Sequence, residues 1–154
     1  MTKRFVTKSA AATKHLGVML AQELTGGEVL LLTGNLGAGK TTFVKGLARG
    51  LGIKQVITSP TFVLMKVYPA RHGRIRQLVH VDCYRLPAAC LSGRQGRHGV
   101  PGVELTKIGL TDYLGAPDTV VVVEWAECMK LPRQALHVKF LPSRASDTRT
   151  ITLR

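Results

Sequence analysis

The chain has 154 residues, of which 45% are hydrophobic and 20% charged, a balance typical of one globular domain with a substantial core. Its apolar runs, such as Val120 to Val123, are too short to cross a bilayer, and the basic N-terminus lacks the apolar segment of a secretory signal. Cys83, Cys90 and Cys128 form neither a CxxC pair nor a zinc-like spacing, so we expect reduced thiols and a cytoplasmic protein.

The net charge of +13 comes from 22 Lys and Arg against only 9 Asp and Glu. Such an excess favours anionic partners, and RNA is the obvious cellular candidate. A general basic bias without a dedicated site explains the charge alone equally well. Because acids are scarce, the ligands of any metal must come from a short list.

The predicted elements of the N-terminal half alternate between strand and helix. Ser9 is a candidate cap for the first helix, and Gly26-Gly27 ends it. We expect strands over Arg4 to Thr7 and Glu28 to Thr33, and helices over Ala10 to Leu24 and Lys40 to Leu51.

The C-terminal half predicts mainly strands. PARHGR, rich in Pro, Gly and Arg, favours a hairpin turn between the first two of them. We expect strands over Phe62 to Tyr68, Ile75 to Val81, Thr119 to Val123, His137 to Leu141 and Thr148 to Leu153, the last two antiparallel across SRASD, and a short helix over Leu105 to Leu114. The segment 86–104 is basic and glycine-rich, and we interpret it as a loop insertion in a single domain over 1–154.

GNLGAGKT, from Gly34 to Thr41, matches the phosphate-binding pattern GxxxxGK[ST] between a predicted strand and a predicted helix. Backbone N–H groups and the helix N-terminus would cradle phosphates there, Lys40 would bridge β- and γ-phosphates, and the Thr41 hydroxyl would bind Mg²⁺. A chance Gly-rich turn is the alternative, which the flanking elements disfavour. The candidate nucleotide-binding residues are Asn35, Leu36, Gly37, Ala38, Gly39, Lys40, Thr41 and Thr42.

Two acids stand at the ends of predicted strands, Asp82 after QLVHV and Glu124 after TVVVV. Ligands of open α/β sheets bind beyond the carboxyl ends of the strands, so both acids are expected to face the loop. Asp82 is the better metal candidate, and Glu124 could position or deprotonate an attacking water. The alternative for each is a helix-capping or salt-bridging carboxylate. We take Thr41, Asp82 and Glu124 as candidate metal ligands, and Lys40, Asp82 and Glu124 as candidate catalytic residues.

TSPT, from Thr58 to Thr61, could bring hydroxyls to Mg²⁺ or the γ-phosphate as a switch loop does, although the pattern alone favours an ordinary Pro turn.

Several pieces in chain order resemble one family: GNLGAGKTTFVKGLARGLG, VITSPTFVLMKVY, LVHVDCYRL, GLTDYL and VVVVEWAE. They are similar to TsaE (YjeE), the small bacterial ATPases that support threonylcarbamoyladenosine formation in tRNA. The resemblance runs from about Thr7 to Glu127, with a weaker echo in the last strands. SPTF, HxDxYRL and EW are far more specific than the phosphate-binding pattern.

The resemblance implies an α/β, P-loop NTPase-like three-layer fold whose mixed sheet has parallel core strands and antiparallel hairpins at its edges. It implies ATP and Mg²⁺ as cofactors, with Thr41 and Asp82 serving Mg²⁺ and Glu124 needed for hydrolysis. Trp125 would lie near the nucleotide. The remaining implied residues are Ser59 and Thr61 in a switch-like loop, and His80, Tyr84 and Arg85 shaping the site or a partner-facing surface.

The family's members are weak ATPases that dock on a TsaD–TsaB heterodimer, with tRNA nearby and the nucleotide site turned toward TsaD. This chain differs from the family at 86–104, which is longer and basic where the family has a short acidic segment. The difference bears on how this surface meets TsaD or tRNA, and leaves the nucleotide residues intact.

Three other classes of protein are alternatives. A GTPase would need an NKxD motif, which the sequence lacks. A small-molecule kinase would need an arginine-bearing lid, for which only the Arg-rich 85–98 stretch qualifies. A basic RNA-associated module with an idle nucleotide site would need an aromatic stacking platform, and the aromatic content is only 5%.

Overall fold

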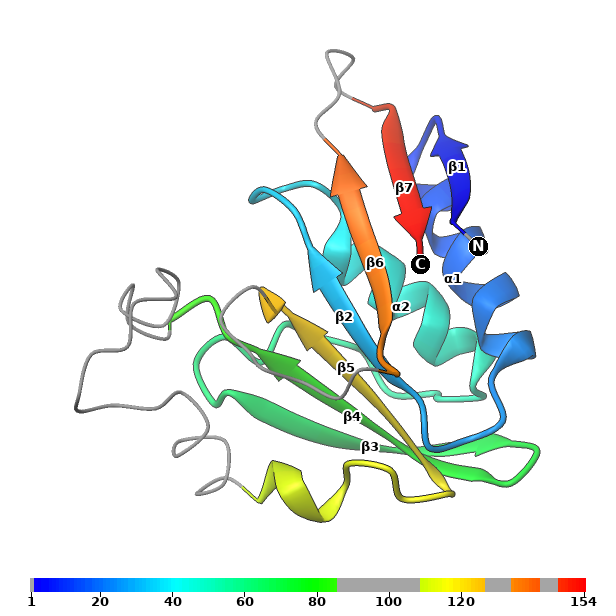
Figure 1. Ribbon diagram of the computed structural model, residues 1–154, viewed down its shortest axis with the longest axis vertical. Coiled ribbons are helices and arrows are strands. Elements are labelled where there is room, and N and C mark those ends of the chain that lie inside the picture. The colour runs from blue at the N-terminus through cyan, green and yellow to red at the C-terminus, as the bar shows by residue number, and fades with distance from the viewer. Residues whose placement is uncertain (1, 86–108, 127–133, 142–146) are drawn as a thin grey trace.

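A seven-stranded mixed sheet forms the centre of the computed structural model, which describes residues 2–85, 109–126, 134–141 and 147–154 (Figure 1). The elements are β1 Lys3–Thr7, α1 Ala10–Glu23, β2 Val29–Thr33, α2 Lys40–Gly50, β3 Met65–His72, β4 Ile75–Asp82, the 3-10 helix η2 Leu110–Asp112, β5 Thr119–Glu124, β6 Leu136–Leu141 and β7 Arg149–Leu153.

The strand order is β1-β7-β6-β2-β5-β4-β3. The four central strands β6, β2, β5 and β4 are parallel. The outer pairs β3/β4, β6/β7 and β1/β7 are antiparallel. The predicted α/β, P-loop NTPase-like fold, with a parallel core and antiparallel strands at the edges, is therefore confirmed.

Both helices lie side by side on one face of the sheet (Figure 1). The Ser9 side chain accepts a hydrogen bond from the Ala12 backbone N–H at 3.0 Å and so caps α1 as expected. The shared core under the helices contains Leu16, Leu20, Leu30, Leu32, Phe43, Leu47, Leu78, Val120, Val122 and Phe140. Burial of these apolar side chains is the main force that holds the helices on the sheet.

The opposite face of the sheet is also buried. Val79, Val81, Val121 and Val123 pack there with Leu110 of η2. Because β2 and β5 have buried residues on both faces, they are apolar almost throughout instead of alternating with polar residues.

One strand boundary and one turn were wrongly predicted. The third strand begins at Met65 instead of Phe62, and most of PARHGR, through His72, continues that strand. The hairpin turn is confined to Gly73 and Arg74, between β3 and β4. Pro69 is tolerated inside β3 because β3 is the edge strand of the sheet, where a missing N–H donor costs little.

Other boundaries differ from prediction by a residue or so. Of the expected helix over Leu105 to Leu114, the structure has only the turn of 3-10 helix at Leu110–Asp112, and 105–108 lie outside the described residues. The insertion 86–104 and most of SRASD also lie outside them. No helix in the described ranges is long and apolar enough to span a membrane.

Candidate functional site

The glycine-rich loop connects the buried strand β2 to α2, which begins at Lys40. Gly39 immediately before it has a φ of 103°, a left-handed conformation that favours glycine. Lys40 is only 4% exposed although it is charged. Its Nζ donates to the Gly34 carbonyl at 2.5 Å and the Asn35 carbonyl at 2.9 Å. The loop therefore wraps around the ammonium group of Lys40.

A cavity of about 360 Å³ opens beside this loop, and we call it the loop cavity. It lies where β2, β4 and β5 end, at the carboxyl edge of the parallel strands. Its lining residues are Leu36, Gly37, Ala38, Gly39, Lys40, Thr41, Thr42, Ser59, Thr61, Asp82, Tyr84, Glu124 and Trp125. Loop, strand ends and the SPTF segment, all distant in the sequence, therefore share one cavity.

Asp82 and Glu124 are register partners on the neighbouring strands β4 and β5. Residues paired in this way project from the same face of a sheet, so both carboxylates point to the helix side, where α2 begins. Both are nearly inaccessible to solvent, at 2% exposed each. Buried carboxylates require hydrogen-bond partners, and these two have different ones.

Glu124 is bonded to the first turn of α2 and to a buried histidine. The Thr41 hydroxyl lies 3.0 and 2.9 Å from the two carboxylate oxygens of Glu124. His80 Nε2 lies 2.8 Å from Glu124 Oε1, and the His80 side chain is fully buried. His80 Nδ1 is buried without a hydrogen-bond partner among the described residues. His80 thus holds the carboxylate of Glu124 from behind while Thr41 meets it from the loop.

Asp82 is bonded to the SPTF segment. Ser59 Oγ donates to Asp82 Oδ2 at 2.5 Å, and Thr61 Oγ1 donates to the same oxygen at 2.8 Å. The Tyr84 backbone N–H donates to Asp82 Oδ1 at 2.8 Å. The two hydroxyls are also within 2.7 Å of each other. The segment that pattern alone assigned to an ordinary Pro turn is therefore tied to the carboxylate of β4.

Trp125 closes one side of the cavity in an unusual backbone conformation. Its φ is 58°, a left-handed value that costs a non-glycine residue about 1–3 kcal/mol. Its ring lies 3.8 Å from Lys40 Nζ and 5.0 Å, between centroids, from the ring of Tyr84. A cation–π contact and a packed ring pair each contribute about 0.5–2 kcal/mol, which is of the same order as this cost.

Arg85, the last described residue before the insertion, lies outside the cavity lining. Its guanidinium carbon is 3.9 Å from the centre of the Phe62 ring, and Phe62 is 80% exposed. Phe62 directly follows Thr61, which lines the cavity, so the pair stands next to that lining in the chain.

The donors in the cavity suit a hard divalent cation with a phosphate. Thr41, Asp82 and Glu124 offer oxygen atoms only, the kind of ligand that Mg²⁺ prefers. Within the described ranges no group of three or more His, Cys, Asp or Glu could hold a metal by itself. A cation at this site would need phosphate and water oxygens as further ligands, which fits the glycine-rich loop beside it.

Arg149 on β7 is a neighbour of the loop that sequence reasoning missed. A Cβ built on Gly39 would lie 3.4 Å from Arg149 Nε and 3.7 Å from Thr13 Cγ2. Arg149 Nη1 is buried without a partner among the described residues. No local pattern could have found this contact, because it depends on β7 lying next to β6 in the sheet.

The fold and the arrangement of this site define an α/β protein of the P-loop NTPase-like class. Comparison with known sequences gives the family. The family described as "Threonylcarbamoyl adenosine biosynthesis protein TsaE" matches residues 7–151, and the chain belongs to it. The resemblance deduced from SPTF, HxDxYRL and EW is confirmed.

Individual relatives cover most of the chain. The protein named "tRNA threonylcarbamoyladenosine biosynthesis protein TsaE" of Streptomyces coelicolor is 42% identical over 114 residues, 74% of this chain and 67% of the relative. The protein of the same name from Bacillus subtilis is 34% identical over 148 residues, 95% of this chain and 81% of the relative. The crystal structure of Bacillus subtilis YdiB superposes with a TM-score of 0.74 at 30% identity, covering 99% of this chain and 84% of that one.

Proposed function

We propose that this chain is a Mg-dependent ATP-binding and ATP-hydrolysing accessory protein of threonylcarbamoyladenosine formation in tRNA, and that it acts on a TsaD–TsaB complex. Membership of the TsaE family supports the pathway. The observation that carries the ATPase proposal is the Thr41–Glu124 pair beside Lys40, which puts a hydroxyl, a carboxylate and an ammonium group in one cavity.

Each of these groups has a role in phosphoryl transfer. Lys40 would exchange the carbonyls of Gly34 and Asn35 for phosphate oxygens, which accept charge-assisted hydrogen bonds more strongly. Mg²⁺ held by Thr41 and Asp82 would neutralise developing phosphate charge when bound. Glu124, fixed by His80, would orient a water molecule and accept its proton.

A partner surface is supported by exposed apolar side chains around the cavity. Leu36 is 74% exposed, Phe62 80% and Val63 56%. Leu36 lines the cavity, and Phe62 and Val63 directly follow Thr61, whose hydroxyl contacts Asp82. Exposed apolar residues gathered at one site favour protein contact. Docking of TsaD–TsaB there would exclude water from the cavity and complete the site.

The deciding experiment is ATP hydrolysis measured with the chain alone and then with purified TsaD–TsaB. We expect slow turnover alone and clear stimulation by the pair. Lys40→Ala is the control, because loss of a charged hydrogen-bonding group should weaken Mg-ATP binding roughly 10- to 150-fold in calorimetry.

Unchanged ATP affinity in Lys40→Ala would remove the loop from nucleotide binding. Turnover that needs a small-molecule acceptor, and not the protein pair, would favour the kinase alternative instead.

A further inference from the structure

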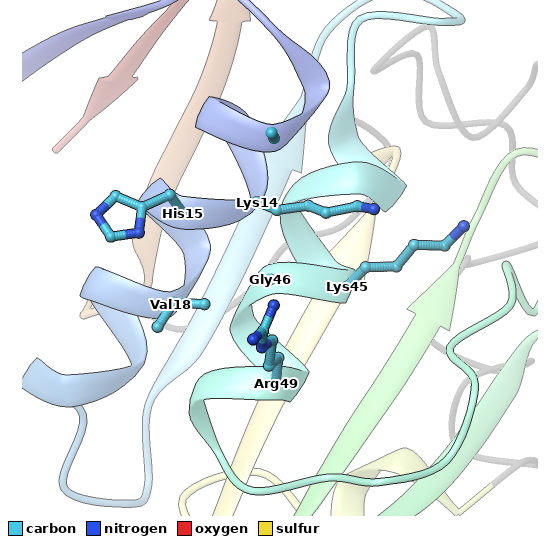
Figure 2. Close-up of a pocket in the computed structure, with 7 residues that line it drawn as sticks. Lys14, His15, Val18, Lys45, Gly46 and Arg49 are labelled. Atoms are coloured by element: carbon cyan, nitrogen blue, oxygen red, sulfur yellow. The ribbon is translucent and has the colours of Figure 1, made fainter.

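A second hollow of about 510 Å³ lies between the two helices, away from the loop cavity. Its lining residues are Ala11, Lys14, His15, Val18, Lys45, Gly46 and Arg49, and we call it the basic groove. None of them lines the loop cavity. Figure 2 shows Lys14 reaching from α1 toward α2, Lys45 extending from α2, and Arg49 turned toward Gly46.

The groove forms because the backbones of α1 and α2 come into contact at Gly17 and Gly46, a line of contact that we call the glycine seam. A Cβ added to Gly46 would lie 2.0 Å from the Lys14 carbonyl oxygen, and one added to Gly17 would lie 2.4 Å from the Phe43 carbonyl oxygen. At such close approach, Lys14, Lys45 and Arg49 stand on either side of one seam. Long side chains that would belong to separate helix surfaces therefore form a single charged surface.

Among the residues that the structure describes, the lining of the groove contains no Asp or Glu to oppose this charge. The one acid in α1 and α2 is Glu23, whose carboxylate is 3.7 Å from Lys3 Nζ. Lys14, Lys45 and Arg49 are all exposed. Three exposed cations along one seam attract anions, and an extended anion with repeated charges can contact all three at once.

The composition of the groove favours a phosphodiester backbone over an acidic protein. Protein interfaces are enriched in Tyr, Trp and Phe and depleted in Lys. The described lining of the groove has two lysines and no Phe, Tyr or Trp, so it offers neither aromatic anchors for a protein nor a platform for stacking bases. Contacts of Lys and Arg with phosphate need no such partner and carry no sequence preference.

We propose that the basic groove binds the phosphate backbone of RNA, and that the RNA is the tRNA whose modification this chain serves, a choice of RNA that rests on the proposed function. The groove shares α2 with the loop cavity, because the helix starts at Lys40 and carries Lys45 and Arg49 about one and a half and two and a half turns later. RNA on the groove is thereby held at a fixed position relative to the loop.

The test compares two triple variants that each remove three charges from the full-length chain. The groove variant is Lys14→Gln, Lys45→Gln and Arg49→Gln. The control variant is Lys54→Gln, Arg71→Gln and Lys139→Gln, three exposed residues outside the groove. Binding of an unmodified tRNA transcript is titrated at several salt concentrations, with poly-glutamate as a second anion and Mg-ATP affinity measured in parallel.

The groove variant should bind tRNA about tenfold more weakly, and its salt slope should fall by about 2, since each phosphate contact contributes about 0.7–0.9. The control variant should keep the wild-type slope. Equal losses in both variants, an unchanged slope in the groove variant, or absence of tRNA binding by the wild type would overturn the proposal. Wild-type binding to poly-glutamate as tight as to tRNA would assign the groove to an acidic protein.

Mg-ATP affinity separates this proposal from the proposed function. The groove variant should retain it, because none of its three residues lines the loop cavity. A wild-type chain that binds tRNA but not Mg-ATP would reject the nucleotide site and would support the groove proposal. The opposite pattern would reject the groove alone.

Discussion

Asp82 and Glu124 are register partners with similar burial, yet they contact different parts of the chain. Glu124 meets Thr41 of α2 and His80, whereas Asp82 meets Ser59 and Thr61. One carboxylate is thus coupled to the phosphate-binding loop and the other to the SPTF segment. Substitution of Glu124 should therefore affect the phosphate-binding loop, and substitution of Asp82 should affect the SPTF segment.

Glu124→Gln should keep Mg-ATP binding and lose partner-stimulated hydrolysis by about 10²–10⁴-fold, the range for a lost general base. The amide preserves the shape of the side chain but cannot accept the proton of a water. Calorimetry measures binding, and phosphate release with TsaD–TsaB measures turnover. Asp118→Asn is the matched carboxyl-to-amide control, because Asp118 directly precedes β5 and Glu124 ends it. Retained turnover in Glu124→Gln would take Glu124 out of the mechanism.

Glu28 illustrates how one carboxylate can stabilise the entry to β2. Burial raises its pKa, but hydrogen bonds from Thr25 and Gly26 outweigh burial and leave the pKa below its ordinary value of 4.5. The Thr25 N–H lies 2.8 Å from Oε1 and the Gly26 N–H lies 2.7 Å from Oε2. A lowered folded-state pKa contributes stability that is present above pH 4.5 and is lost as the pH falls through the lowered pKa.

Glu28→Gln should therefore destabilise the chain at about pH 7 and have little effect at an acid pH below the lowered pKa of Glu28, where the native carboxyl is also neutral. Urea unfolding at the two pH values measures the difference. Glu23→Gln is the control, since Glu23 is exposed and its carboxylate lies 3.7 Å from the Nζ of the exposed Lys3. A Glu28→Gln effect of equal size at both pH values would mean that the charge is irrelevant to the turn.

The chemistry of single residues was predictable where a motif carried it, and contacts were not. GNLGAGKT identified Lys40 and Thr41, and the strand ends identified Asp82 and Glu124. The sequence could not indicate that Thr41 pairs with Glu124 and Ser59 with Asp82, because these contacts depend on strand register. The roles assigned to these residues stay predictions.

At the level of elements, α1 and α2 are joined by contact between backbones. Gly46→Ala should destabilise the fold by about 3 kcal/mol, because the new Cβ would overlap the Lys14 carbonyl and force the helices apart. Inside a helix, Gly→Ala usually increases stability by about 1 kcal/mol. The sign of the change in the free energy of unfolding therefore tells whether the helix backbones are in contact. Thermal or urea unfolding gives the answer.

Lys45→Ala, one residue earlier and exposed, is the matched control and should change stability little. Stabilisation by Gly46→Ala would show that the helices separate easily and that the seam does not define the groove.

Helices and buried strands were predictable from periodicity and glycine boundaries, while the β3 boundary was not. From the sequence alone, Pro69 indicated a turn, because the position of its strand in the sheet was unknown. At the edge of the sheet the same residue is compatible with a strand. Edge position is a property of the whole sheet, so local sequence could not supply it.

At the scale of the whole molecule, the exposed apolar residues Phe62 and Val63 do not belong to the lining of the basic groove. Phe62→Ser should reduce stimulation by TsaD–TsaB and leave intrinsic ATP binding unchanged, because Phe62 is exposed and does not line the loop cavity. Titration of the pair against ATP turnover gives the affinity. Val56→Ser, at a residue that is 82% exposed and also outside the cavity lining, is the control. Equal effects of both variants would place the partner elsewhere.

The overall fold was predictable because the motif order and the mixed sheet go together in this class of protein. The net charge of +13 predicted an anionic partner without locating it. Only the packing of α1 on α2 gathers Lys14, Lys45 and Arg49 into one hollow, since Lys14 lies on α1 and the other two lie on α2.

The glycine seam also decides how this surface can change. Because the helix main chains approach closely at Gly17 and Gly46 and the side chains of Lys14, Lys45 and Arg49 are exposed, these three side chains can be replaced without disturbing the seam. Charge at positions 14, 45 and 49 can therefore be removed, reversed or redistributed while the fold stays intact. The molecule thus has a surface that selection or an engineer can retune independently of the cavity at the other end of α2.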